Sequence, residues 1–392
     1  MATTAWRCSH TEQKERRQII IDPIRECVCL PALPPCSPNL ITLPGPRFPK
    51  REPYCRKKLL TRVSSENQFY DRYRQWIDKT LANIPVPEGD AYALLPRVES
   101  VCLAELDHLL GTSLLAGRWP QTEYRRYPLL YWQLVRYYQI ELYRSKQLNQ
   151  LQPHAGFNFK RMGFVAMLLA LLGDRRRLTD CVALAHSAPA ICPANEYIRP
   201  YFIEAFALQL TSRFLGWGTL PLGVDLAQEP LYLALLTLWD SEDVGTVGHL
   251  LTQACHLHTY GGLKDPRFHR EEAIIGWWHY WPLEVLLVLR LRQWAGLPLP
   301  VVNHPLMVAP FDVLPPALED PADVWPYAAL PRHFATHYPE APVLLAQMCQ
   351  PPASAEPDAW PSLSELEAVL ARGIPKWPPQ RGDTPKPRRK MG

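Results

Sequence analysis

Three histidines in the second half of the sequence have the side chains best suited to chemistry. His256 and His258 lie in "CHLHTYGG", and His279 lies in the aromatic stretch "IIGWWHYWPLE". Two residues apart on a helix means about 200° of rotation, so His256 and His258 should face different neighbours and not share a metal. The sequence has no HExxH, no GxSxG and no phosphate-binding glycine loop. It therefore predicts no catalytic, metal-binding or cofactor-binding residues, and an enzyme site built on these histidines is the least favoured hypothesis.

Cysteine is the other candidate metal ligand, and Cys27, Cys29, Cys36 and Cys55 form its densest group. Structural zinc sites pair their ligands at C-x₂₋₄-C spacing, which this group does not match. The start of the chain lacks the apolar region of a secretory signal, so we expect reduced thiols and a cytoplasmic protein. The longest apolar run, residues 164–173, is half of the about 20 residues that a membrane helix needs, so no membrane contact is expected.

Acidic residues gather at three places that resemble turns or helix starts, one of which is the pair Glu319 and Asp320. Carboxylates there cap helices or remain solvated, and they can also meet a basic partner. The net charge is only +4, with one basic cluster at 386–390, so direct nucleic-acid binding is not predicted. The candidate contact residues for a protein partner are Asp240, Glu242, Asp243, Glu271 and Glu272.

Apolar residues at three- and four-residue spacing recur through most of the chain, and they predict an all-α fold. We expect an irregular array of antiparallel helical hairpins between proline-rich, extended N- and C-terminal segments. Glycines should end the helices at Gly111, Gly173, Gly216 and Gly296. The predicted divisions are an arm over 1–60, an N-terminal helical domain over 61–152, a C-terminal helical domain over 153–350, and a tail over 351–392 with one short helix at 362–373.

The aromatic stretch at 274–284 leads into an apolar run that ends at Leu291, which indicates a helix buried on several sides. Pro282 should either kink this helix near Trp278 or make it start afresh at Trp281. Glu284 would then be a buried carboxylate that needs partners, and an indole N–H or a tyrosine hydroxyl could donate a hydrogen bond to it. Its neighbours one turn on are Leu287 and Val288, so any cationic partner must come from another helix.

The succession "GWWHYWPLEVLLVLRL" and "LPLPVVNHPLMVAPFDVLP" resembles the C-terminal half of helical immunity proteins that accompany polymorphic toxins. The nearest are the two-domain, PoNi-like immunity proteins paired with nuclease toxins of type VI secretion. The specific part of the resemblance covers residues 274–313. The matching marker residues, to which we assign a structural role, are Gly276, Trp277, Trp278, Tyr280, Trp281, Glu284, His304 and Pro305.

This resemblance implies a cytoplasmic protein without catalysis that binds a cognate toxin and covers or distorts its active site. The acidic residues named above would then form the toxin-contact rim. The alternative hypothesis is a helical adaptor or chaperone for a secreted effector, because helical arrays offer concave binding faces. The sequence carries no indication of the toxin's chemistry or of the oligomeric state.

Overall fold

The computed structural model describes residues 123–147, 159–191, 202–220, 229–264, 281–317 and 338–352, together with single positions between 95 and 119, at 222, 226 and 336, and between 360 and 368. All of them lie in one contact unit, residues 41–392. The described elements are α4 (Glu123–Gln147), α5 (Phe159–Leu172), α6 (Arg175–Ile191), α7 (Phe202–Phe214), α8 (Pro230–Leu238), α9 (Val244–Lys264), α10 (Leu283–Trp294) and α12 (Ala341–Met348).

These residues contain helices and no strand, which confirms the all-α prediction for the described part of the chain. The hairpin arrangement and the domain boundary at residue 152 stay predictions. The proline-rich arm over 1–60 lies outside the described residues, and so do the four cysteines at 27, 29, 36 and 55 and Gly111. In the tail, the backbone N–H of Leu366 donates to the carbonyl of Ser362 at 3.0 Å, within the predicted 362–373 helix.

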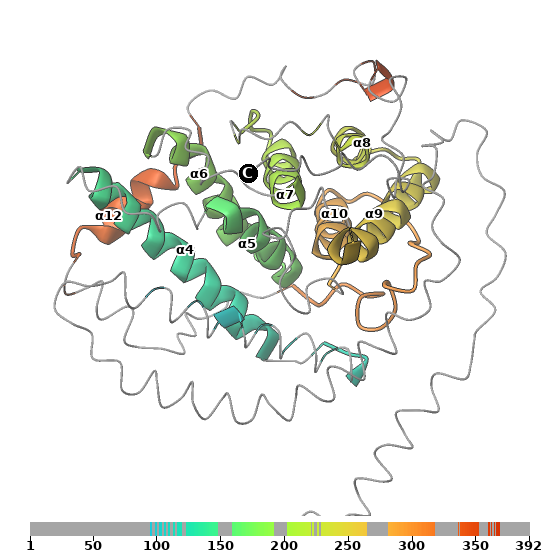
Figure 1. The fold of residues 1–392 in the computed structure, drawn as a ribbon, viewed down its shortest axis with the longest axis horizontal. Coiled ribbons are helices and arrows are strands. Elements are labelled where there is room, and N and C mark those ends of the chain that lie inside the picture. Colours follow the sequence, from blue (N-terminus) through green and yellow to red (C-terminus); the bar gives the residue numbers. More distant parts are fainter. Residues whose placement is uncertain are drawn as a thin grey trace, which may run out of the picture. The chain divides into compact units, whose positions relative to one another are not determined.

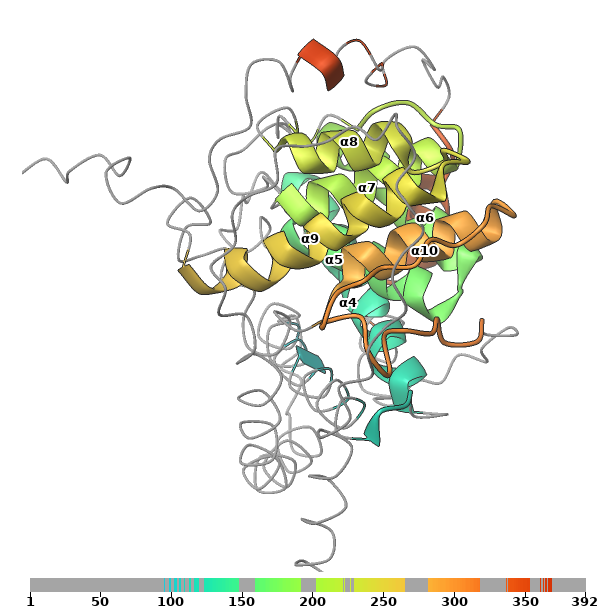
Figure 2. The same ribbon diagram turned by 90° about the vertical axis from the view of Figure 1, so that its right-hand side faces the viewer.

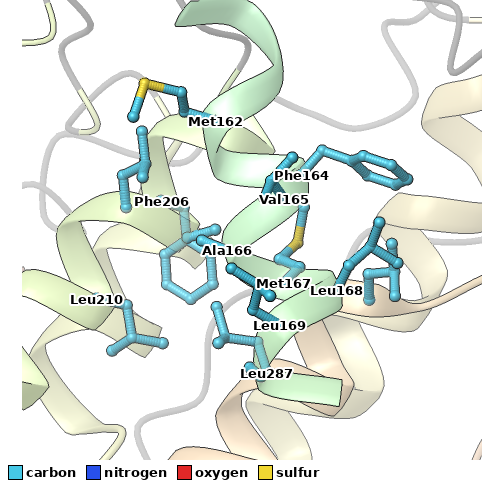
Figure 3. Close-up of a cluster of buried hydrophobic side chains, with 14 of the residues drawn as sticks. Met162, Phe164, Val165, Ala166, Met167, Leu168, Leu169, Phe206, Leu210 and Leu287 are labelled. Carbon is cyan, nitrogen blue, oxygen red and sulfur yellow. The ribbon is translucent and has the colours of Figure 1, made fainter. Parts of the chain in front are cut away.

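Helix α5 is the centre of the packing, and it contacts α4, α6, α7 and α10 (Figures 1 and 2). Every residue from Met162 to Leu172 is buried, because the sequence there is apolar on all faces of the helix. Figure 3 shows Phe206 and Leu210 of α7 and Leu287 of α10 gathered beside α5. The apolar run at 164–173 is therefore a core helix.

Three helices end at the glycines that the sequence singled out. Gly173, Gly216 and Gly296 have φ angles of 77°, 72° and 71°, which L-amino acids with a side chain rarely adopt. At each one, the N–H of the glycine and the N–H of the next residue return to carbonyls of the last turn. This is the Schellman arrangement, and it confirms the three predicted helix ends.

The residue after Gly173 begins the next helix. The Asp174 carboxylate accepts from the backbone N–H of Arg177 at 3.0 Å and from its guanidinium at 2.6 Å. An aspartate in this position satisfies an N–H at the start of a helix that has no partner within the helix. Gly173 and Asp174 together thus turn the chain from α5 into α6 within two residues.

Gly163 permits the close approach of α5 and α7. A Cβ atom at this position would lie 2.3 Å from the backbone carbonyl oxygen of Glu204, a contact that backbone atoms cannot easily relieve. We expect Gly163→Ala to lower the free energy of unfolding by about 1–3 kcal/mol, the usual cost of overpacking a core. Urea denaturation followed by circular dichroism measures this difference.

Gly245→Ala is the matched control. This glycine is exposed in the first turn of α9, and a Cβ there would meet only the Asp243 carboxylate, at 3.1 Å. Because alanine is the better helix former, this variant should unfold at the same urea concentration or higher. Equal destabilisation of both variants would contradict the close-approach argument.

Candidate functional site

Helix α10 begins directly after Pro282. Its first residue is Leu283, and Pro282 stands at the N-cap with φ −75° and ψ 62°. Proline needs no hydrogen-bond donor in that position, so its missing N–H costs nothing. Of the two predicted alternatives, a helix start at this proline agrees with α10, which begins two residues after Trp281, whereas Trp278, the site of the other predicted alternative, lies outside the described residues. The markers Gly276, Trp277, Trp278 and Tyr280 lie outside the described residues, as does His279.

Glu284 lies in the first turn of α10 and is 1% exposed. Its Oε1 lies 2.7 Å from Nδ1 of His258, on α9, and both side chains are almost completely buried. This hydrogen bond joins the first turn of α10 to α9. The partner of Glu284 lies on another helix, which is where the sequence placed any cationic partner. Among the described residues, the hydrogen-bond partner of Glu284 is an imidazole and not an indole or a tyrosine hydroxyl.

A third helix contributes Tyr232, from α8, to this buried polar centre. Burial raises the pKa of the Tyr232 phenol well above its ordinary value, and the negative charge of Glu284 raises it further. The tyrosine therefore stays protonated and neutral beside the carboxylate. Glu284 thus interacts with side chains of both α8 and α9 from the start of α10.

A pair of histidines lies on another side of α9. The backbone N–H of Leu306 donates to Nδ1 of His304 at 3.0 Å, so the proton of a neutral His304 must be on Nε2. This Nε2 lies 3.2 Å from Nδ1 of His256, which must then accept. The ring centroids are 4.5 Å apart at 86°. His304 is buried, whereas Pro305 next to it is exposed.

Two histidines of α9 therefore contact Glu284 and His304, the two polar marker residues that the structure describes. His258 faces Glu284 on α10, and His256 faces His304 in the loop after α10. The prediction that His256 and His258 point to different neighbours is confirmed. The two histidines therefore make two separate contacts that join α9 to α10 and to the loop after it. His258 and Glu284 are closed off from solvent, and His256 has a different partner.

The acidic turn, defined as residues 240–243, joins α8 to α9. Asp240 and Glu242 are exposed. Asp243 caps α9: its carboxylate accepts from the backbone N–H groups of Gly245 at 3.0 Å and Thr246 at 3.1 Å, and from the Thr246 hydroxyl at 2.7 Å. The hydrogen bonds from Thr246 hold the pKa of the Asp243 carboxyl below its ordinary value. The other two candidate contact residues, Glu271 and Glu272, lie outside the described residues.

Arg292 fixes the backbone of this turn through hydrogen bonds from its buried side chain. It is completely buried, and its guanidinium donates to the carbonyls of Trp239 at 2.5 Å, Ser241 at 2.9 Å and Pro298 at 2.8 Å. Burial lowers the pKa of the guanidinium, and the nearby Asp240 carboxylate opposes that shift. The turn is therefore fixed through its backbone, while the side chains of Asp240 and Glu242 face solvent.

The sequence reasoning missed this arginine and its neighbour Arg290, which is 2% exposed. Arg290 donates to the carbonyls of Ala170, Leu171 and Pro315, and to the Gln293 side chain. Polar residues after Leu291 suggested that the buried stripe ended there. The available signal was the run "VLRLRQW", in which two arginines interrupt an apolar sequence with no acidic residue one turn away.

No group of three or more histidines, cysteines or carboxylates among the described residues could hold a metal ion. None of the described helices is both long and apolar enough to cross a membrane. Comparison of the chain with protein-family models, with curated proteins and with solved structures finds no match in any of the three.

The buried pair gives a stability prediction. We expect Glu284→Ala to lower the free energy of unfolding by about 3–5 kcal/mol, because it leaves a buried imidazole without its carboxylate. The double variant Glu284→Ala/His258→Ala should cost less than the sum of the two single variants, by about 0.5–3 kcal/mol. Glu242→Ala, on the exposed turn, is the control. Additive losses would show that the two side chains do not interact.

The histidines also predict how stability depends on pH. Burial lowers the pKa of His186 and of His249, and the nearby His256 lowers that of His249 further. The unfolded chain, with a histidine pKa of about 6.5, then binds more protons than the folded chain, so stability must fall as pH drops below about 6.5. The loss ends once the pH is below the lowered folded-state values.

Urea denaturation at pH values between about 7.5 and 5.5 tests this expectation. Nε2 of His186 lies 2.8 Å from the Ser212 hydroxyl, and that hydroxyl donates to the carbonyl of Gly218. The neutral ring must therefore donate from Nε2, as a glutamine amide can. The variant His186→Gln/His249→Gln should show a smaller loss of stability on acidification. An unchanged loss would assign the effect to other groups.

Proposed function

We propose that the protein is an immunity protein that binds a cognate antibacterial toxin in the cytoplasm and neutralises it by covering or distorting its active site. The proposal starts from the resemblance of residues 274–313 to helical immunity proteins. The toxin is the partner, and neither nucleic acid nor a membrane takes part.

The observation that carries the proposal is the rigid presentation of an exposed acidic turn. Arg292 and the Asp243 cap fix the backbone of residues 239–246, yet Asp240 and Glu242 point to solvent. Carboxylates that are held in place but carry no packing role suit recognition of a basic partner surface, where charge complementarity speeds association.

The marker residues fit a supporting role in this proposal. Glu284 and His304 link α10 and its following loop to α9, the helix whose N-terminus carries the acidic turn. Residues matched by the resemblance would then preserve the scaffold, while the contact residues vary with the toxin. This division agrees with the structural role that the sequence analysis assigned to the markers.

Co-expression tests the proposal. The product of the gene immediately upstream is expressed in a sensitive bacterial strain, with this protein or with an empty vector. Growth should be restored only when this protein is present, and the two proteins should co-purify at a fixed ratio. Failure of both rescue and complex formation would end the immunity hypothesis. A stable complex that leaves the toxin lethal would instead favour the adaptor or chaperone.

A further inference from the structure

The loop after α10 runs beside the start of α9, and two contacts fix its position. Arg292 donates both to the Pro298 carbonyl and to the carbonyls of Trp239 and Ser241, so these two chain segments meet at one guanidinium. Further along, a Cβ on Gly248 would lie 2.9 Å from the carbonyl oxygen of Val301. Residues 298–301 therefore follow the first turns of α9 from the acidic turn to Gly248.

This strip exposes apolar side chains that the core does not use. Val244, Leu299 and Val301 are 39%, 47% and 78% exposed. They are three of the five large hydrophobic residues exposed in the described part of the chain, and the other two are Val313 and Val343. Isolated exposed apolar residues are common, but a group beside one turn marks a contact surface.

The exposed charged side chains of these two segments are acidic, whereas the Arg292 guanidinium beneath them is buried. Residues 239–250 and 295–304 contain no lysine or arginine, while the acidic turn contributes Asp240, Glu242 and Asp243. The chain as a whole carries a net charge of +4, so this region is opposite in sign to the rest of the molecule. An apolar centre with a charged rim is the usual composition of a protein-binding site.

We propose that Asp240, Glu242, Val244, Leu299 and Val301 form the toxin-binding surface, here named the α9 entry surface. Its partner is a folded protein face with an apolar centre surrounded by lysine or arginine. This inference rests on the proposed function and specifies its contact site. A second copy of the chain does not fit, because a twofold contact would bring the two acidic turns together.

The two parts of the surface have separate tasks in binding. Val301 and Leu299 supply apolar area that is desolvated in the complex, which slows dissociation. Asp240 and Glu242 attract the basic partner from a distance, and salt weakens that attraction. Charge reversal should therefore act mainly on association and on its salt dependence, whereas substitution of the apolar pair should act mainly on dissociation.

Binding kinetics test the inference with the purified full-length chain and the purified product of the upstream gene as probe. The two surface variants are Asp240→Lys/Glu242→Lys and Leu299→Asp/Val301→Asp. Each should weaken binding by about tenfold or more, the first through association and the second through dissociation. Thermal unfolding of Leu299→Asp/Val301→Asp should remain as in the unmodified chain, because neither side chain is buried. Asp240 also interacts with the Arg292 guanidinium, so Glu242→Lys alone is measured beside the double charge reversal, and it should slow association without changing thermal unfolding.

Matched controls carry the same changes elsewhere. Asp312→Lys/Glu367→Lys and Val313→Asp/Val343→Asp alter exposed residues that do not belong to the α9 entry surface, and they should change the affinity by less than about twofold. If the unmodified chain binds and rescues but the surface variants do so equally well, the α9 entry surface is wrong and the immunity function stands. If the unmodified chain neither binds nor rescues, both proposals fail. A dimer in light scattering that the surface variants abolish would make a second copy the occupant and overturn the inference.

Discussion

The described fold depends on how the ends of its helices are satisfied inside the protein. The last carbonyls of a helix lack partners within the helix and carry the negative end of its dipole. Two buried arginines on α10 meet this need for two helices: Arg290 at the end of α5, through Ala170 and Leu171, and Arg292 after α8, through Trp239 and Ser241. A guanidinium suits this role, because its five N–H groups are arranged in a fixed plane and can reach several carbonyls at once.

Helix α10 thereby joins parts of the chain that are far apart in sequence. Arg290 reaches residues about 120 positions earlier, and Glu284 at the other end of the helix reaches His258. Buried charges of this kind are costly to desolvate, and each stays favourable only while its partners remain in place. The position of α10 is therefore specified by directional contacts as well as by apolar packing against α5.

The sequence predicted the features that follow local rules. The ends at Gly173, Gly216 and Gly296 could be predicted because a positive φ at a helix end is a property of glycine itself. The restart of α10 follows from Pro282, and the burial of Glu284 follows from the width of the apolar face. Sequence reasoning limited any cationic partner of Glu284 to another helix, but only the packing of α9 against α10 shows that His258 is the residue that meets it.

The contacts of Arg290 and Arg292 could not be predicted, because they do not follow from local sequence rules. Their partners are backbone carbonyls, which every residue has, so no partner residue type could reveal the contacts. A charged residue inside an apolar run indicates either an exposed edge or a buried hydrogen-bond network, and the choice depends on tertiary neighbours. The exposure of Leu299 and Val301 was equally hidden, because it depends on which face of the loop after α10 lies against α9.

Because the contacts that position the α9 entry surface involve backbone carbonyls, most of its side chains can be substituted without loss of those contacts. Arg292 holds the turn through the carbonyls of Trp239, Ser241 and Pro298, and the close contact at Gly248 is with the carbonyl of Val301. The side chains of Glu242, Leu299 and Val301 are exposed and make none of these contacts, and Asp240 adds only its charge near the Arg292 guanidinium. Substitutions at Glu242, Leu299 and Val301 therefore alter charge and shape without removing one of the contacts that hold the turn. A protein that must follow changes in a partner's surface needs this separation, since its specificity can vary while the arginines, the Asp243 cap and the histidine links keep the scaffold constant.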